Sequence, residues 1–363
     1  MEENKKIDII QVIPTLGIGG AEIVVENLVR ELKNKQYNVL VVTFFSNETF
    51  ISERIKNLGI PIIYLDKKLG FDISIMRKLF DIFSKYKPKV VHSHLSATLY
   101  CLPIEVLLGI KSRIHTTHNL AEKDAGIFSK ILYRIFFKLF KLIPVAISEK
   151  VKSSISKVYH VDSSHIPLIY NGVLLADFNR KSNYEITKNI EIVHVGRLSE
   201  PKNHVTMIKA VQILKTKYPN LTLKLIGQGE KQEELSELVE TLGLEKNIIF
   251  VGAVDDVRNF LLEADIFILP SLWEGMPISL IEAMATGLPI IASDVGGIGE
   301  MISHEESGLL IEPDTDALVD SINSLIESQW LRECLGNNAY IKSLDFTSDI
   351  MAEKYIELYR KGE

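Results

Sequence analysis

The chain has 363 residues, a hydrophobic content of 46% and a net charge of −6, which together predict a globular protein of two domains. It contains only two cysteines, which excludes a disulfide framework and fits a reducing cytosol. No apolar run reaches the roughly 18 residues that a membrane-spanning helix needs, and the polar start of the sequence does not resemble a signal peptide.

The two halves of the sequence carry opposite charge. Residues 1–172 contain 24 basic and 16 acidic residues, whereas residues 173–363 contain 17 basic and 31 acidic residues. Such an asymmetry indicates a different partner for each half. Because the sequence shows no basic module interleaved with aromatic residues, we expect no nucleic-acid partner.

The first predicted elements are a strand over residues 7–13, a turn over 14–20 and an amphipathic helix over about 21–33. Three glycines lie in this turn, and the last two are Gly19 and Gly20. Glycine lets the backbone approach a ligand closely, and the start of a helix offers free N–H groups to an anion. The spacing differs from the G-x-G-x-x-G pattern, so it does not predict a dinucleotide site.

Strands and helices then alternate, which predicts a parallel sheet covered by helices on both faces. Further strands are expected over residues 39–44, 61–65, 90–94, 113–118 and 145–148. Ligands bind such sheets outside the carboxyl ends of the strands, where His118 lies. Strand alternation places His92 and His94 on one face of the sheet, where we expect them to pack in the core. His115 and His118 do not form a convincing metal pair, because no carboxylate or cysteine lies at ligand spacing.

Residues 127–143 predict a basic amphipathic helix. Lys130, Arg134 and Lys138 recur every four residues, Lys141 continues the stripe, and apolar side chains fill the other face. Such a helix can lie in the interface of an anionic membrane. The alternative is a helix packed on its own sheet with a solvated lysine face. We favour the membrane contact.

The second half opens with a phosphate-binding pattern. The turn at Asn171 and a polar, irregular segment over residues 173–189 predict a linker between two domains. The following strand, residues 190–195, leads to Arg197 and Lys202. A guanidinium holds phosphate with a planar fork, and an ammonium acts as a point charge. Two further strands are expected over residues 221–227 and 247–252.

Residues 268–297 form the most informative stretch. A strand over residues 266–269 leads to a loop, a helix that begins at Pro277 and ends before Gly287, and another strand over 289–293. Asp314-Thr315-Asp316 imitates a metal-binding D-x-D motif, but an amphipathic run follows it. We therefore expect those residues to start a helix.

Two glutamates flank the start of the helix in this stretch. Glu274 lies in the loop, and Glu282 lies more than one turn into the helix. The free N–H groups and the dipole of the helix start favour an anion, while each carboxylate can accept hydrogen bonds from sugar hydroxyls. The arrangement predicts a polyhydroxylated ligand that bears phosphate.

Together these motifs resemble the retaining glycosyltransferase family 4, also called glycosyltransferases group 1. Glu274 and Glu282 match the E-x7-E signature of that family, and residues 274–277 match its E-G-x-P core. Residues 196–202 match its G-R-x-x-x-x-K element.

Shorter matches extend the resemblance over most of the chain. The turn at Gly19-Gly20 resembles the family's G-G-A-E loop, His118 resembles a histidine that approaches the sugar, and residues 227–230 resemble a G-x-G-x turn near the nucleotide. Residues 171–173 resemble an N-G-V/I-D turn, although Leu174 replaces its aspartate.

The resemblance implies the GT-B architecture, in which two doubly wound parallel-sheet domains face a cleft. It implies transfer of a sugar, with retention of configuration, from a nucleotide-diphosphate donor to a hydroxyl of a saccharide or lipid-linked saccharide in cell-surface polysaccharide biosynthesis. We expect UDP as the nucleotide. Arg197 and Lys202 would neutralise the leaving diphosphate, so we expect no metal and no cofactor.

The resemblance also implies the roles of individual residues. Glu274 would hold hydroxyls of the donor sugar, Glu282 the ribose, and His118 would hydrogen-bond the sugar. The implied catalytic residues are His118, Arg197, Lys202 and Glu274. The implied donor-binding residues are Gly19, Gly20, Asn171, Gly196, Arg197, Lys202, Gly227, Val251, Gly252, Glu274, Gly275, Met276, Pro277, Ile278 and Glu282.

We expect an acceptor-side domain over residues 1–172, a linker over 173–189, a nucleotide-sugar-binding domain over 190–345 and a terminal helix over 346–363 that packs back on the first domain. The expected location is the cytoplasm, with peripheral contact to the inner face of the membrane. Two alternatives stay open: a nucleotide-sugar epimerase of related fold, and a catalytically inactive partner subunit.

Overall fold

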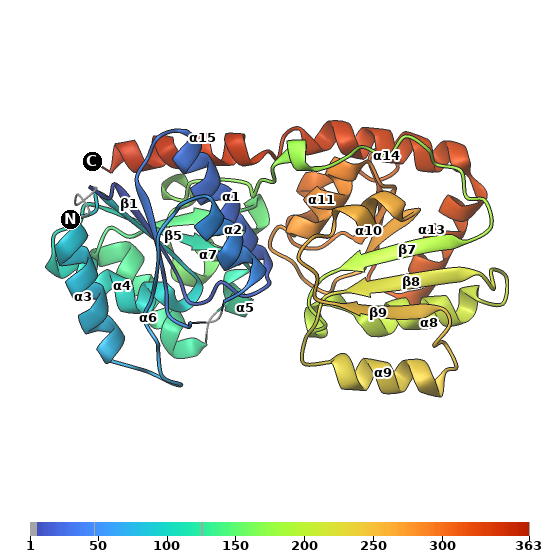
Figure 1. Cartoon of the computed structure of the whole chain (residues 1–363), viewed down its shortest axis with the longest axis horizontal. Helices are drawn as coiled ribbons and strands as arrows, with labels where there is room; N and C mark the ends of the chain where they lie inside the picture. Colours follow the sequence, from blue (N-terminus) through green and yellow to red (C-terminus); the bar gives the residue numbers. More distant parts are fainter. Residues whose placement is uncertain (1–5, 47, 125, 363) are drawn as a thin grey trace. The chain divides into compact units, whose positions relative to one another are not determined.

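The computed structural model describes residues 6–46, 48–124 and 126–362, apart from the side chains of residues 124, 127 and 128. The chain divides into two compact units (Figure 1): unit 1 comprises residues 1–172 and 348–363, and unit 2 comprises residues 173–347. The segment predicted as a linker belongs to unit 2. Tyr184 is buried there, and its hydroxyl donates to the carbonyl of Gly287 at 2.8 Å.

In the described part of unit 1, six parallel strands form one sheet in the order β3-β2-β1-β4-β5-β6. The strands are β1 (Ile9–Ile13), β2 (Val39–Thr43), β3 (Ile62–Tyr64), β4 (Val90–His94), β5 (Ser112–Thr117) and β6 (Ile143–Ala146). The helices are α1 (Gly20–Asn34), α2 (Phe50–Asn57), α3 (Ser74–Tyr86), α4 (Thr98–Leu107), α5 (Ala121–Asp124), α6 (Ile127–Leu139), α7 (Glu149–Tyr159) and α15 (Ser348–Lys361), with 3-10 turns at Leu95–Ala97 and Ser163–His165. Every residue of β1, β2 and β4 is buried, as expected for strands covered on both faces.

Unit 2 contains a second parallel sheet, in the order β12-β11-β10-β7-β8-β9. The strands are β7 (Ile190–Val195), β8 (Leu221–Ile226), β9 (Ile248–Gly252), β10 (Ile266–Leu269), β11 (Ile290–Ser293) and β12 (Leu309–Ile311). The helices are α8 (His204–Leu214), α9 (Gln232–Thr241), α10 (Arg258–Glu263), α11 (Ile278–Thr286), α12 (Ile298–Met301), α13 (Thr315–Glu327) and α14 (Gln329–Ser343), with 3-10 turns at Leu175–Asp177 and Glu200–Lys202.

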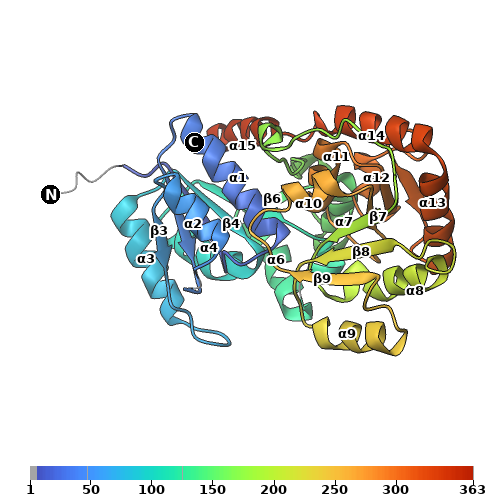
Figure 2. The same cartoon turned by 45° about the vertical axis from the view of Figure 1, so that its right-hand side comes forward.

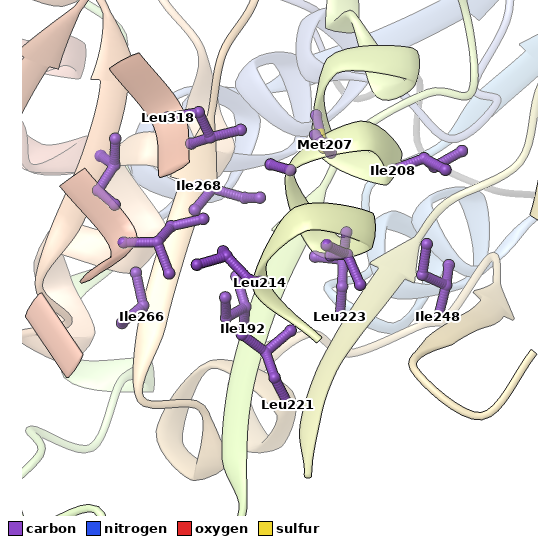
Figure 3. Packing of buried hydrophobic residues seen from close by; sticks show 14 of the residues in the cluster. Ile192, Met207, Ile208, Leu214, Leu221, Leu223, Ile248, Ile266, Ile268 and Leu318 are labelled. Atoms are coloured by element: carbon purple, nitrogen blue, oxygen red, sulfur yellow. The ribbon is translucent and has the colours of Figure 1, made fainter. Parts of the chain in front are cut away.

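The core of unit 2 lies between its sheet and the helices that cover it. Ile192 of β7, Leu223 of β8 and Ile268 of β10 belong to one buried cluster with Met207 and Leu214 of α8 (Figure 3). Burying one such side chain contributes about 1.5–3 kcal/mol. These residues fix the strands whose carboxyl ends carry the predicted phosphate-binding motifs.

The topology identifies where each sheet should bind a ligand. Doubly wound sheets bind ligands at the switch point, where the strand order reverses. In unit 1 the order reverses between β1 and β4, and in unit 2 it reverses between β7 and β10. The predicted glycine turn follows β1, the Arg197 motif follows β7 and the Glu274 loop follows β10.

The parallel α/β class predicted from the sequence is confirmed, with local corrections. β6 comprises Ile143–Ala146 rather than 145–148, because the Ser148 hydroxyl accepts a hydrogen bond from the backbone N–H of Val151 at 3.1 Å and so caps α7. β12 was not predicted, since a strand of three residues is too short for a periodic pattern. Asp314 accepts from the N–H of Ala317 at 2.9 Å and caps α13, as expected of a helix start.

The last helix returns to unit 1, where it lies alongside α1 in Figures 1 and 2. The Ser348 hydroxyl at the start of α15 donates to Oε1 of Glu31 at 2.7 Å. Lys35 forms an ion pair with Asp349 at 2.7 Å. One end of α15 is thus fixed to α1 by polar contacts, and its tyrosines enter the interior of unit 1.

Candidate active site

An ion pair lies at the switch point of unit 2. Nζ of Lys202 donates to Oε1 of Glu274 at 2.5 Å, and the hydroxyl of Ser271 donates to the same oxygen at 2.7 Å. Glu274 is 9% exposed, and the side chain of Lys202 is 16% exposed. Both hydrogen bonds end on Oε1, so Oε2 is left to accept hydrogen bonds from a ligand.

The backbone around Lys202 is tied to the loop that carries Glu274. Asn203 has a left-handed backbone (φ 56°), and its side-chain amide donates to the carbonyls of Pro270 at 3.1 Å and Pro313 at 3.0 Å. The N–H of Leu272 donates to the carbonyl of Pro201 at 2.8 Å. These bonds fix the position of Lys202 before any ligand binds.

Glycines join the carboxyl ends of three neighbouring strands. The N–H of Gly196 donates to the carbonyl of Ile226 at 2.9 Å, and the N–H of Gly227 donates to Gly252 at 2.8 Å. Gly227 has φ 136°, and a Cβ there would lie 2.0 Å from the carbonyl oxygen of Gly196. The predicted donor-binding residues at the carboxyl ends of β7, β8 and β9 therefore lie together, and the side chain of Arg197 is exposed at the same edge.

The loop after β11 braces the loop that carries Glu274. Gly296 has φ 57°, and a Cβ there would lie 1.9 Å from the carbonyl oxygen of Glu274. The N–H of Gly297 donates to the carbonyl of Gly275 at 2.8 Å. The turn after β11 therefore lies against the backbone of Glu274 and Gly275.

Replacing Gly296 by alanine should displace this loop and reduce turnover at least tenfold, because the added Cβ would overlap the Glu274 backbone. Gly243→Ala is the matched control: Gly243 also has a left-handed backbone (φ 62°), but a Cβ there meets nothing within 4 Å. In both variants, placing alanine in a left-handed backbone costs about 1–2 kcal/mol. Only Gly296→Ala adds the overlap between Cβ and the Glu274 backbone. Turnover and melting temperature of the two variants are the measurement. Equal losses in both would contradict the bracing role.

The second glutamate lies in α11. Pro277 was expected as the first helical residue, but it is the N-cap with an extended backbone (ψ 123°), so the helix begins at Ile278. Glu282 is buried one turn into the helix, and Met276 and Ile278 are buried beside its start. The nine residues of α11 direct the positive end of their dipole toward the Glu274 loop.

Two histidines that the sequence did not indicate lie beneath this edge. His194 Nδ1 lies 3.0 Å from the carbonyl of Ile268, and its ring lies 4.9 Å from the ring of His204. Burial lowers the pKa of His204 to about 4 and holds the pKa of His194 well below its usual range. Both rings are therefore neutral near pH 7 and add no positive charge next to Lys202. Side-chain alternation along β7 could have predicted which face of the sheet His194 lies on, but not its contact with His204.

Unit 1 carries the remaining predicted residues. Gly19 is the N-cap of α1 and Gly20 its first residue, whereas His118 follows β5 directly. Nε2 of His118 lies 2.9 Å from Nδ1 of His94, and burial lowers the pKa of His118 to about 4. His118 is neutral near pH 7 and is suited to hydrogen bonding rather than to charge stabilisation. His92 and His94 are both buried with their rings 4.2 Å apart, as expected for one face of the sheet.

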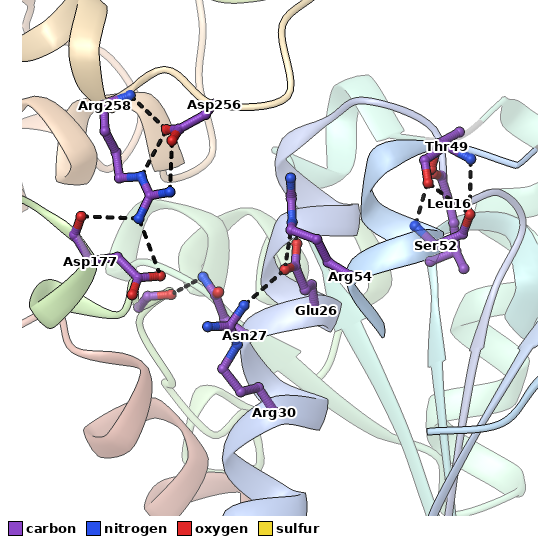
Figure 4. A network of polar contacts seen from close by, with 11 residues as sticks. Leu16, Glu26, Asn27, Arg30, Thr49, Ser52, Arg54, Asp177, Asp256 and Arg258 are labelled. Carbon is purple, nitrogen blue, oxygen red and sulfur yellow. Dashed lines mark hydrogen bonds and ion pairs between the residues drawn. The ribbon is translucent and has the colours of Figure 1, made fainter. Parts of the chain in front are cut away.

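Polar contacts join α1 to α2 and to the turn at Asn171 (Figure 4). Glu26 is buried in α1 and accepts two hydrogen bonds from Arg54 of α2, each at 2.8 Å. The side chain of Asn27 donates to the carbonyl of Gly172 at 3.0 Å. The predicted residues thus form two groups: Gly19, Gly20, His118 and Asn171 lie in unit 1, and the others lie in unit 2.

Within residues 6–46, 48–124 and 126–362, no three His, Cys, Asp or Glu side chains are grouped so that they could hold a metal ion. In the same ranges, no helix has both the length and the apolar character to cross a bilayer.

Sequence comparisons match both halves of the chain to known protein families. Residues 18–176 match the family model "Glycosyltransferase Family 4", and residues 176–342 match "Glycosyl transferases group 1". A UDP-Gal:alpha-D-GlcNAc-diphosphoundecaprenol alpha-1,3-galactosyltransferase of Escherichia coli is 28% identical over 337 residues, which cover 87% of each chain. An N-acetylgalactosaminyltransferase of Campylobacter jejuni that acts on a diphospho-undecaprenol-linked sugar is 28% identical over 191 residues, or 52% of each chain.

Among solved structures, Anabaena HepE in complex with UDP and glucose has a TM-score of 0.85 at 19% identity, over 97% of this chain and 98% of that one. This likeness shows the fold. The two six-stranded parallel sheets are those of the GT-B architecture.

Proposed function

This chain belongs to the group 1 glycosyltransferases, and we propose that it moves a sugar from a UDP-sugar to a hydroxyl of a lipid-linked saccharide with retention of anomeric configuration. The observation that carries the proposal is the Lys202–Glu274 pair at the switch point of unit 2. A cation and a carboxylate that share one edge suit a ligand with a diphosphate and a polyhydroxylated sugar. UDP and the undecaprenyl-linked acceptor are supported by the names of the similar proteins.

In this mechanism, unit 2 neutralises the negative charge of the leaving diphosphate. As the bond to the anomeric carbon breaks, negative charge grows on the leaving diphosphate, and the sugar becomes oxocarbenium-like. Lys202 is held in place by Glu274 and by the backbone bonds around Asn203, so it needs no reorganisation when the charge develops. Arg197 is exposed at the same edge and supplies a second cation with a planar fork.

The other residues orient the donor. Oε2 of Glu274 accepts hydrogen bonds from sugar hydroxyls, and Glu282 accepts them from the ribose. The backbone of Val251 and Gly252 lies at the end of β9, beside Gly227. In this proposal it contacts the base. His118 of unit 1 hydrogen-bonds the transferred sugar. No residue is assigned as the base that takes the proton of the acceptor hydroxyl.

A donor panel tests the proposal. Purified protein is given UDP-galactose, UDP-glucose, UDP-N-acetylglucosamine and GDP-mannose with an undecaprenyl-diphosphate-linked sugar, after treatment with EDTA. We expect transfer from one UDP-sugar, an α-linked product by NMR, and activity that survives chelation because Lys202 and Arg197 provide the positive charge. Inversion would exclude the retaining reaction, and loss that magnesium or manganese restores would exclude metal independence.

The same panel separates the alternatives. A nucleotide-sugar epimerase would convert the donor in the absence of any acceptor. A catalytically inactive partner subunit would neither transfer sugar nor hydrolyse any donor. Transfer that depends on the acceptor is the result that our proposal requires.

We further propose that α6 contacts an anionic membrane surface. Tyr133, Phe136 and Phe137 form the buried side of the helix. Its outer side exposes Ile131 (55%) and Leu139 (72%). Arg134, Lys138 and Lys141 are exposed with them. The ring of Phe136 packs inward, and the exposed apolar residues lie among the basic ones. Such a surface suits the headgroup region of a bilayer.

At low salt, the protein should sediment with anionic vesicles. The sedimented fraction should fall as the salt concentration rises, because salt screens the charge. Replacing Arg134, Lys138 and Lys141 by glutamate should abolish binding. Lys130 is left intact because its Nζ donates to the carbonyl of Glu122 at 2.8 Å. The control replaces three other exposed lysines of unit 1, Lys85, Lys87 and Lys157, by glutamate. Equal release by both triple variants would show a net-charge effect and not a membrane-binding face.

A further inference from the structure

A chain of hydrogen-bonded side chains crosses the interior of unit 1 and ends at His118. Nε2 of His118 lies 2.9 Å from Nδ1 of His94, and Nε2 of His94 lies 2.9 Å from Oε1 of Gln11. The amide nitrogen of Gln11 donates to the hydroxyl of Tyr359 at 3.1 Å. The chain therefore joins the carboxyl end of β5 to α15 by way of β4 and β1.

The chain continues beyond Tyr359 within the same core. The Tyr359 hydroxyl lies 2.8 Å from Nδ1 of His92, and Nε2 of His92 lies 2.7 Å from the hydroxyl of Thr116. Thr116 also meets the hydroxyl of Tyr355, one turn earlier in α15, at 2.7 Å. Both tyrosines of α15 thus contact the network, but only Tyr359 contacts Gln11.

Burial determines how the protons of this network are arranged. Gln11, His92 and His94 have no exposed surface, and Tyr359 is almost as buried. Burial holds the pKa of His92 and of His94 well below the usual range and raises the pKa of Tyr359. The histidines are therefore neutral and the tyrosine is protonated. With water excluded, each donor must find its acceptor inside the network.

The orientation of the Gln11 amide gives these hydrogen bonds a direction. Gln11 presents its carbonyl oxygen to His94, and a carbonyl oxygen only accepts, so neutral His94 carries its proton on Nε2. Nδ1 of His94 then has a lone pair and accepts from Nε2–H of His118. Neutral His118 is left with a lone pair on Nδ1. Rotating the Gln11 amide by half a turn would reverse every step.

We propose that Gln11 is a positioning residue that sets the tautomer of His118 through His94, so that His118 offers Nδ1 as a hydrogen-bond acceptor to a hydroxyl of the donor sugar. The proposal rests on the contact between His118 and the sugar that the proposed function contains. It gives α15 a role in the active site, because the Tyr359 hydroxyl accepts from the Gln11 amide nitrogen and directs its own proton to Nδ1 of His92, which leaves no donor for a rotated Gln11 carbonyl.

Nitrogen-15 NMR of the histidine side chains in the whole protein, without substrate, measures the tautomers directly. We expect His94 and His118 each to carry a proton on Nε2 and a lone pair on Nδ1. A proton on Nδ1 of His118 would overturn the proposed direction.

Two tyrosine variants test the dependence on α15. In Tyr359→Phe the Gln11 amide loses the acceptor of its N–H group, so its two orientations become comparable and His118 should shift to a mixture of tautomers. Tyr355→Phe removes the same hydroxyl from the same helix without touching Gln11, and His118 should keep one tautomer. The same response in both variants, or no response in Tyr359→Phe, contradicts the proposal. If Tyr359→Phe does not fold, Gln11→Met removes the amide itself and should give the same mixture.

Kinetics separate this proposal from the proposed function. Loss of one hydrogen bond should lower kcat of Tyr359→Phe about two- to tenfold and leave the Kd of UDP unchanged, because UDP lacks the sugar. An unchanged kcat with mixed tautomers would remove the positioning role. If wild-type protein transfers sugar from no donor, the proposed function fails, whereas the tautomer measurement still decides whether Gln11 controls His118.

Discussion

Replacing Lys202 by methionine should lower kcat about 10²- to 10³-fold, the loss that typically follows removal of one group that stabilises charge in a transition state. Lys202 is a partly buried cation at the switch point, and its Nζ is positioned by Glu274. Methionine keeps most of the side-chain volume but removes the charge. The KM for the UDP-sugar should rise less than kcat falls, since the charge on the diphosphate grows as the bond to the sugar breaks.

The chain offers a matched control for this experiment. Lys224 of β8 forms an ion pair with Glu191 of β7 at 2.6 Å, and its side chain is 18% exposed, close to the 16% of Lys202. This pair lies along the strands and not at their carboxyl ends. Lys224→Met should therefore reduce stability by an amount similar to Lys202→Met and leave turnover within about twofold. A Lys202→Met enzyme as active as the Lys224→Met enzyme would remove Lys202 from the catalytic site.

Strand positions were predicted well where the residues of the strand itself mark it as buried. β4, β7 and β10 have the predicted bounds. Of these, β10 is a continuous apolar run, as expected of a strand buried on both faces. Strand boundaries failed where another element competed for the same residue, as Ser148 does when it caps α7 instead of extending β6. The parallel class needed only the alternation of strands and helices.

The candidate site was predictable only in part, for a physical reason. The sequence nominated Lys202 and Glu274 through their match to the family's motifs. Each follows a strand, and parallel topology brings these strand ends to one edge of the sheet. The Gln11–Tyr359 contact joins residues 348 positions apart, and no local pattern records such a pair. The close approach of Gly296 to the Glu274 backbone likewise depends on how two loops pack, so no local pattern predicts it.

The two glutamates should contribute to different parts of donor binding. Glu274 lies in the loop before α11 and should meet the transferred sugar, whereas Glu282 lies within α11 and should meet the ribose. Loss of charge-assisted hydrogen bonds typically costs about 1.5–3 kcal/mol, or roughly 10- to 150-fold. Glu274→Ala should therefore reduce turnover by that factor and leave the affinity for free UDP almost unchanged, because UDP has no sugar for Glu274 to hold.

Glu282→Ala should instead weaken the binding of free UDP itself by roughly 10- to 150-fold. The structure sharpens this contrast, since Oε1 of Glu274 is occupied by Lys202. In Glu274→Ala the backbone bonds around Asn203 still hold Lys202, so this variant should bind UDP about as tightly as the wild type does. Calorimetric titration of UDP into both variants measures the difference. If Glu274→Ala weakens UDP binding as much as Glu282→Ala does, then both glutamates hold the nucleotide, and the sugar must be held by other residues.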